Sequence, residues 1–169
     1  MEWRSRIVGH GSVDPESLTG NPKNHRKHPQ AQRDVVRDSI AELGFVKSVL
    51  VNKTTGYIID GHERVWQALD AKETNPGVTI DVEYVELSEA EEAKALAILD
   101  ASTGMAEVDA GKLEELLAEV STDSEAISQM LKELQVEIVI PPEDFKDYDE
   151  DIETDHECPK CGYKFSGGK

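Results

Sequence analysis

The sequence has little of several features that mark other classes of protein. Its two cysteines, Cys158 and Cys161, lie close together near the end of the chain, which excludes the disulfide framework of a small secreted domain. No segment approaches the roughly 18 apolar residues that a membrane-spanning helix needs. The first six residues are charged where a signal peptide would be apolar. We therefore expect a cytoplasmic protein that has no membrane partner.

Basic residues are also scarce, because the 169 residues include 35 acidic and 18 basic side chains and carry a formal charge of −17. Such a charge argues against binding nucleic acid over the whole surface. The acidic residues are unevenly distributed along the sequence, however. Residues 1–37 carry a net charge of +3, residues 38–80 carry −2, residues 81–157 carry −21 and residues 158–169 carry +3. This asymmetry indicates two parts with different partners.

The hydrophobic pattern predicts a mixture of helices and strands. Val36, Ile40 and Leu43 recur at helical spacing and Gly44 follows them, which is typical of a helix over 30–43. Ser88 and Glu91 fit a capping box at the start of a later helix. The pattern predicts further helices at 62–71, 88–101, 109–120 and 123–134, and strands at 4–8, 49–51, 57–59 and 79–85. The strands 49–51 and 57–59, joined by the turn 52–56, are typical of a β-hairpin.

The order of these elements predicts an α+β fold. We expect a small domain of sheet and packed helices in residues 1–100, then an acidic helical extension in 101–140. An acidic linker would follow in 141–157. Residues 158–169 would form a tail that is either disordered or a zinc knuckle. Trp3 and Trp66 are interpreted as packing residues rather than as base-stacking residues.

The segment Asp60-Gly61-His62-Glu63-Arg64 lies where a predicted strand turns into a helix. Backbone N–H groups at a helix N-terminus, beside a glycine and an arginine, are suited to holding phosphate oxygens. His62 could act there as a hydrogen-bond donor or as a base. The alternative is structural, since Asp60 as N-cap and Glu63 three residues later would make a capping box.

The two carboxylates of this segment conflict with a phosphate ligand, because like charges repel. A bound Mg²⁺ that bridges carboxylate and phosphate would resolve the conflict. Otherwise Asp60 and Glu63 must point away from the ligand, or one of them serves as a base toward a substrate hydroxyl.

Two boxes in the sequence resemble those of the ParB/sulfiredoxin superfamily, and more closely the ParB-like nuclease domain proteins of phages and bacteria. The first box is Asn21-Pro22-Lys23-Asn24-His25-Arg26 and the second is Ile59-Asp60-Gly61-His62-Glu63-Arg64. Between them lie Leu43-Gly44-Phe45 and the predicted strand 49–51, in the same order as in that superfamily. The resemblance covers about residues 4–100, and it places the protein in a bacterium or a phage-infected cell.

The resemblance implies a small mixed sheet with packed helices, in which the second box holds nucleotide phosphates and the first box faces it. Gly61 and Arg64 correspond to the phosphate-holding glycine and the last arginine of the second box, with Asp60 beside them. Asn24 and Arg26 correspond to the polar members of the first box.

Departures from the superfamily pattern reduce the range of reactions expected of this protein. Partition proteins that hydrolyse CTP usually have two adjacent arginines, and Glu63 replaces the first of them, which argues against CTP use. Sulfiredoxins need a cysteine where this chain has His62, so their chemistry is absent. The Asp-Gly-His-x-Arg pattern is similar to that of a free-serine kinase of the superfamily, which keeps phosphoryl transfer open with His62 or Glu63 as the catalytic, proton-handling residue.

Basic residues of the N-terminal half are candidates for contact with the DNA backbone. The alternative is an ordinary solvated loop and helix face. The candidates are Lys23, Lys27, Arg33 and Arg37, which lie on either side of Arg26 in the sequence.

The C-terminal segment resembles one knuckle of a zinc ribbon. Cys158 and Cys161 would bind one Zn²⁺ and His156 could be a third ligand, although structural zinc takes four. The alternatives are a tail without metal and a redox-active pair, the latter disfavoured because the motif lies in a polar tail.

These features lead to three hypotheses of function. The favoured one is a ParB-like, DNA-associated accessory protein that binds nucleotide or DNA phosphate at residues 60–64. It would work with a DNA methyltransferase or another phage DNA enzyme through its acidic half. The second is an enzyme, either a nucleotide-dependent phosphotransferase or a metal-dependent nuclease. The third is a non-catalytic acidic adapter.

Overall fold

The computed structural model describes residues 3–137, 156–162 and 164–165. The contacts divide the chain into two compact units, Met1–Glu137 and Ile138–Lys169. The helices of the first unit are α1 (Gln30–Leu43), α2 (His62–Thr74), α3 (Glu89–Thr103), α4 (Ala110–Glu119) and α5 (Glu125–Glu137), with a short 3₁₀ turn η1 (Pro15–Ser17). Its strands are β1 (Ile7–Val13), β2 (Val49–Asn52), β3 (Ile58–Asp60) and β4 (Ile80–Val85).

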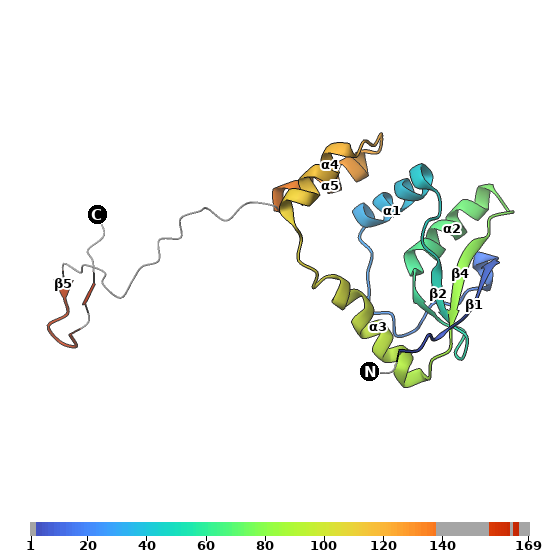
Figure 1. The fold of residues 1–169 in the computed structure, drawn as a ribbon, viewed down its shortest axis with the longest axis horizontal. Helices are drawn as coiled ribbons and strands as arrows, with labels where there is room; N and C mark the ends of the chain where they lie inside the picture. Colours follow the sequence, from blue (N-terminus) through green and yellow to red (C-terminus); the bar gives the residue numbers. More distant parts are fainter. Residues whose placement is uncertain (1–2, 138–155, 163, 166–169) are drawn as a thin grey trace. The chain divides into compact units, whose positions relative to one another are not determined.

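The four strands form one mixed sheet in the order β1-β4-β2-β3 (Figure 1). β1 and β4 are antiparallel, β4 and β2 are parallel, and β2 and β3 form the antiparallel hairpin that the sequence predicts. The parallel pair requires a crossover, which α2 provides between β3 and β4. The structure therefore confirms the predicted α+β class.

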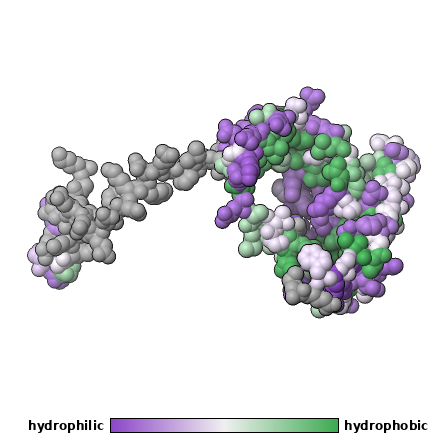
Figure 2. All heavy atoms as spheres, viewed as in Figure 1, coloured by the Kyte–Doolittle hydropathy of each residue, from purple (hydrophilic) through white to green (hydrophobic). Residues whose placement is uncertain are grey.

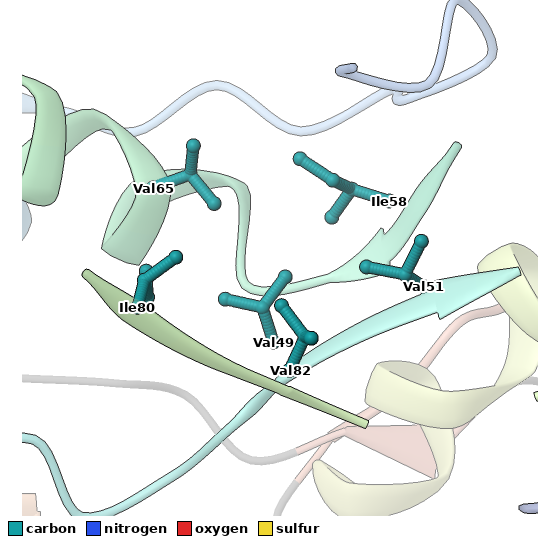
Figure 3. Close-up of a cluster of buried hydrophobic side chains, with 6 residues drawn as sticks. All are labelled: Val49, Val51, Ile58, Val65, Ile80 and Val82. Atoms are coloured by element: carbon teal, nitrogen blue, oxygen red, sulfur yellow. The ribbon is translucent and has the colours of Figure 1, made fainter. Parts of the chain in front are cut away.

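The core lies between the sheet and α2 (Figure 3). Alternate residues of each strand point to the same face, so β2, β3 and β4 each contribute apolar side chains to it. Full burial of each Val or Ile stabilises the fold by about 1.5–3 kcal/mol. The buried cluster consists of Val49, Val51, Ile58, Val65, Ile80 and Val82.

Helix α1 begins and ends where the sequence predicts, but none of its residues is buried. It contacts α2 and α5, and of its apolar stripe Val36 and Ile40 are half-buried while Leu43 is exposed. Figure 2 shows hydrophobic side chains at the surface over this helix. The stripe is therefore only partly covered.

Two predictions from the sequence are wrong in detail. The first strand begins at Ile7 and continues to Val13 through His10 and Gly11, because backbone pairing with β4 outweighs the weak strand propensity of this segment. Trp3 and Trp66 do not pack in the core, since they are 89% and 58% exposed.

Two further predictions concern membrane-spanning helices and the acidic linker. No helix in the described part of the chain is long and apolar enough to span a membrane. The predicted acidic linker of 141–157 lies almost entirely outside the described residues.

Candidate functional site

The turn from β3 into α2 is built around Gly61. Its φ of +99° is a left-handed conformation that favours glycine. A Cβ at this position would lie 2.9 Å from Nη2 of Arg64 and 3.1 Å from Cγ2 of Val49. Position 61 therefore requires glycine for two reasons, the left-handed backbone and the close approach of Arg64.

Gly61 is also the N-cap of α2, and its carbonyl accepts the N–H of Val65. The predicted capping box of Asp60 and Glu63 is therefore wrong. A glycine cap has no side chain that could accept a hydrogen bond, and the first N–H groups of a helix have no partner within it. Within the described residues, the N-terminus of α2 therefore stays open, with no side-chain cap.

The carboxylate of Asp60 lies beside the turn and contacts two cations. Its Oδ2 is 3.0 Å from Nη2 of Arg64 and 3.1 Å from Nζ of Lys47. Burial on its own would raise the pKa of Asp60, but the charges of Arg64 and Lys47 outweigh it and hold the pKa below its usual value. Asp60 is therefore ionised at neutral pH, and this group of three carries a net positive charge.

The loop of the first box is shaped by its asparagines. The N–H of Asn24 donates to the carbonyl of Asn21 at 3.0 Å, which closes a turn around Pro22. The side-chain oxygen of Asn21 accepts the N–H of Lys23, and that of Asn24 accepts the N–H of Arg26. These are Asx turns, in which a short polar side chain replaces a backbone acceptor.

The two boxes line one cavity of about 200 Å³. The loop contributes Asn24 and Arg26, and the turn contributes the whole segment from Asp60 to Arg64. The structure thus brings together all seven residues that the sequence names for phosphate binding and catalysis. The other lining residues are His25, His28, Gln32, Val36, Lys47, Ile59 and Leu96.

His62 contacts the first box directly. Its Nε2 accepts the backbone N–H of Asn21 at 3.2 Å. Burial lowers the pKa of His62, the charges of His28 and Arg26 lower it further, and Asp60 opposes them. The ring is therefore neutral at neutral pH.

Glu63 is buried, and its carboxylate faces α1 and the next turn of α2. Its Oε1 accepts hydrogen bonds from Nε of Arg33 at 3.2 Å and from Nε2 of Gln67 at 2.7 Å. The carboxylate thus joins α1 to α2 beside the cavity. A role in catalysis for Glu63 stays a prediction.

The predicted DNA contacts fall into two groups. Arg33 and Arg37 of α1 both form ion pairs. Arg33 pairs with Glu63 of α2, and Arg37 pairs with Asp34 and Asp38 of its own helix. Lys23 and Lys27 belong to the loop of the first box. Contact of these four residues with DNA stays a prediction.

Sequence reasoning missed Lys47 and Glu92. Lys47 precedes β2, and no local pattern relates it to Asp60. Glu92 is 3% exposed and accepts hydrogen bonds from the side chains of Asn21 and Asn52 at 2.9 and 2.7 Å. Glu92 follows Glu89 and Glu91 in one acidic run, and the sequence does not distinguish it from them. In the structure Glu89 is exposed and Glu91 is half-buried, whereas Glu92 is buried.

The C-terminal unit contains a hairpin of β5 (His156–Glu157) and β6 (Lys164–Phe165) around the two cysteines. The N–H of Gly162 donates to the carbonyl of Cys158 at 2.9 Å. Backbone N–H groups of Lys160 and Cys161 lower the pKa of the Cys158 thiol. The described residues nevertheless contain no group of three His, Cys, Asp or Glu side chains that could hold a metal, so His156 is not brought together with both thiols.

Comparisons with known proteins found similarity among solved structures. No protein-family model matches the chain, and no curated protein matches it. The chromosome-partitioning protein ParB of Caulobacter crescentus, truncated at its C-terminus and complexed with CTP-gamma-S, is 22% identical over 73% of this chain and 71% of that one, with a TM-score of 0.49. The ParB-N domain of a Pnob8-like ParB is 13% identical with a TM-score of 0.45, and the match covers 80% of this chain and about half (52%) of that one.

Proposed function

We propose that this protein binds the phosphate groups of a nucleotide or of DNA in the cavity between the two boxes, as a ParB-like, DNA-associated accessory protein. The observation that carries the proposal is the open N-terminus of α2 beside Arg64. Unpaired N–H groups and an arginine at one helix end make a favourable site for an anion.

The charge and size of the cavity support a phosphate ligand. Arg26, Lys47 and Arg64 line it, against the carboxylates of Asp60 and of Glu63, which is already paired with Arg33. Ligand pockets usually have about 300–1,000 Å³, so a cavity of about 200 Å³ accommodates phosphate groups rather than a whole nucleotide. The base and sugar of a nucleotide would lie outside.

Arg64 also keeps donor capacity. Its Nη2 donates to Asp60, but its buried Nε has no hydrogen-bond partner among the described residues. A buried donor without a partner costs about 1–3 kcal/mol. A ligand oxygen that accepted a hydrogen bond from Nε would recover part of that cost.

Asp60 bears on whether a metal accompanies the ligand. Its carboxylate opposes a phosphate, and a divalent cation such as Mg²⁺ would turn the repulsion into a bridge. We propose that a nucleotide therefore enters with Mg²⁺, and an Mg²⁺-dependent affinity is the expected result.

A binding panel tests the proposal. Isothermal titration with CTP, ATP, GTP and UTP, with and without Mg²⁺, and mobility shifts with duplex DNA should show binding by the wild type. Arg64→Ala should weaken binding about 10- to 100-fold, because hydrogen bonds to charged groups contribute about 1.5–3 kcal/mol. Lys53→Ala, which removes one positive charge from the exposed turn after β2, should have no effect. A blank panel, or equal losses in both variants, contradicts the proposal.

The acidic second half is proposed to contact a protein partner, a DNA methyltransferase or another phage DNA enzyme, rather than DNA. The support is the net charge of −21 over residues 81–157, which would repel a phosphate backbone. Capture of such an enzyme by the wild type, and its loss when Glu114, Glu115 and Glu119 of α4 are replaced by Gln, would support this. Retention of the partner by that variant contradicts it.

We also propose that Cys158 and Cys161 supply two ligands of a Zn²⁺ site. Backbone N–H groups directed at the Cys158 thiol favour the thiolate, which is the form that binds metal. Zinc analysis of the purified chain should show metal that Cys158→Ser removes, and a metal-free wild type contradicts the proposal.

A further inference from the structure

The tautomer of His62 is determined by one hydrogen bond. The backbone N–H of Asn21 lies 3.2 Å from Nε2 of His62, and a backbone N–H can only donate. A neutral imidazole has one acceptor nitrogen and one N–H. Since Nε2 is the acceptor, the proton of the neutral ring lies on Nδ1.

Asn21 itself is held firmly. It is 6% exposed, its Nδ2 donates to Oε1 of Glu92 at 2.9 Å, and its Oδ1 accepts the N–H of Lys23 at 2.9 Å. The other oxygen of Glu92 accepts hydrogen bonds from the side chains of Asn52 and Thr55. A chain of hydrogen bonds thus runs from α3 through the first box to the ring of His62.

The buried carboxylate of Glu92 needs such an explanation, because burial of a charge is costly without compensating hydrogen bonds. Burial alone would raise the pKa of Glu92, but the hydrogen bonds from Thr55, Asn52 and Asn21 outweigh it, and the pKa is lowered. Glu92 is therefore an ionised acceptor that fixes the position of Asn21.

We propose that His62 offers its Nδ1–H to the cavity as a fixed hydrogen-bond donor for a phosphate oxygen, and that Asn21 and Glu92 are the residues that position it. The identity of the ligand rests on the proposed function. Of the two roles that the sequence allows for His62, this tautomer favours the donor, since the lone pair of Nε2 that a base would use is occupied.

The tautomer is measured without any ligand. Long-range ¹H–¹⁵N correlation spectra of the ¹⁵N-histidine-labelled full chain at pH 7.5 should show a protonated Nδ1 and an unprotonated Nε2 for His62, assigned by its loss in His62→Asn. A protonated Nε2, or a fully protonated ring, overturns the inference. This result stands even if phosphate binding fails, so the two failures are distinguishable.

The positioning role is tested on α3 with a matched pair. Glu92→Gln should weaken the hold on Asn21 and reduce the Nδ1–H population of His62, whereas Glu91→Gln on the same helix should leave it unchanged. If Glu92→Gln fails to fold, Asn21→Ser removes the same link. An unchanged His62 spectrum in a folded Glu92 or Asn21 variant overturns the positioning role.

The donor role is tested with inorganic pyrophosphate as the probe. The side-chain amide of Asn places an N–H near the position of Nδ1, and that of Gln places it near Nε2. We expect His62→Asn to keep most of the affinity and His62→Gln to lose about tenfold, the order of one hydrogen bond to a charged group. The reverse order overturns the inference.

Discussion

The N-termini of α2 and α3 look alike in the sequence and differ in the structure. Asp60 precedes α2 and Glu63 lies in its first turn, and Ser88 and Glu91 stand at α3 with the same spacing. In α3 the capping box forms, since the N–H of Ser88 donates to Glu91 at 2.8 Å and the N–H of Glu91 donates to the hydroxyl of Ser88 at 3.4 Å. In α2 the cap is Gly61 and no side chain of the cap closes the end.

The difference shows what each end is used for. At α3 the protein satisfies its own N–H groups, which stabilises the helix. At α2 the carboxylate of Asp60 contacts Lys47 and Arg64 instead, and the open end lies at a cavity lined by the first box. An uncapped helix end beside cations is what an anion site requires.

The largest expected effect comes from filling the α2 turn. Gly61→Ala forces a side chain into a left-handed conformation, which costs about 1–2 kcal/mol, and it displaces Arg64. We expect that loss of stability in urea denaturation, together with at least a tenfold loss of pyrophosphate affinity.

Gly56→Ala is the control for this substitution. Gly56 has a φ of +78°, but beyond its chain neighbours no atom of the described residues lies within 4 Å of the place that a Cβ would take. The variant should lose similar stability and keep full pyrophosphate affinity. Equal losses of affinity in both variants would mean that strain, and not the place of Arg64, explains the effect.

The next effect comes from the Asp60 carboxylate. Asp60→Asn removes the charge that opposes a phosphate while Lys47 and Arg64 remain, so pyrophosphate affinity without Mg²⁺ should rise about tenfold. The gain should shrink when Mg²⁺ is added. Weaker binding in Asp60→Asn would show that the carboxylate positions Arg64 more than it repels the ligand.

A smaller effect is expected at the closed end of α3. Ser88→Ala removes a cap and should cost about 1 kcal/mol of unfolding free energy in urea. Pyrophosphate affinity should not change, because Ser88 lies at the other helix. A loss of affinity would contradict the separation of the two ends.

The smallest effect concerns pH. The pKa of His62 is lowered in the folded protein, whereas the unfolded chain has the usual value of about 6.5. The unfolded state therefore binds more protons as the pH falls below 6.5, and the contribution of His62 to stability is complete above that value and declines below it. Urea unfolding at pH 7.5 and 5.5 should show a larger loss in the wild type than in His62→Asn. Equal losses would mean that His62 titrates normally in the folded chain.

Much of the fold could be predicted, because its signals are local. The helix 30–43 follows from the spacing of Val36 and Ile40 and from Gly44, and the hairpin follows from its turn at 52–56. The partners of the site could not be predicted in the same way. Lys47 reaches Asp60, and Glu92 reaches Asn21, only through the pairing of strands and the packing of α3, for which the sequence has no local pattern.

The two boxes show the same contrast between what the sequence predicts and what only the fold determines. Their residues are recognisable in the sequence, and the structure places them around one cavity. The role of Asp60 is harder to predict, because the Asp-x-x-Glu spacing fits a capping box. That spacing does not reveal that Gly61 adopts a left-handed conformation or that two cations compete for the carboxylate.

An amide titration measures directly whether the open end of α2 holds phosphate. Inorganic pyrophosphate is added to the ¹⁵N-labelled full chain while backbone amide shifts are recorded. The amides of His62, Glu63 and Arg64 should shift together and saturate, while those of Glu89 to Glu91 at the capped end of α3 stay in place. Shifts that spread over surface lysines, or no shift at the α2 end, would contradict the account.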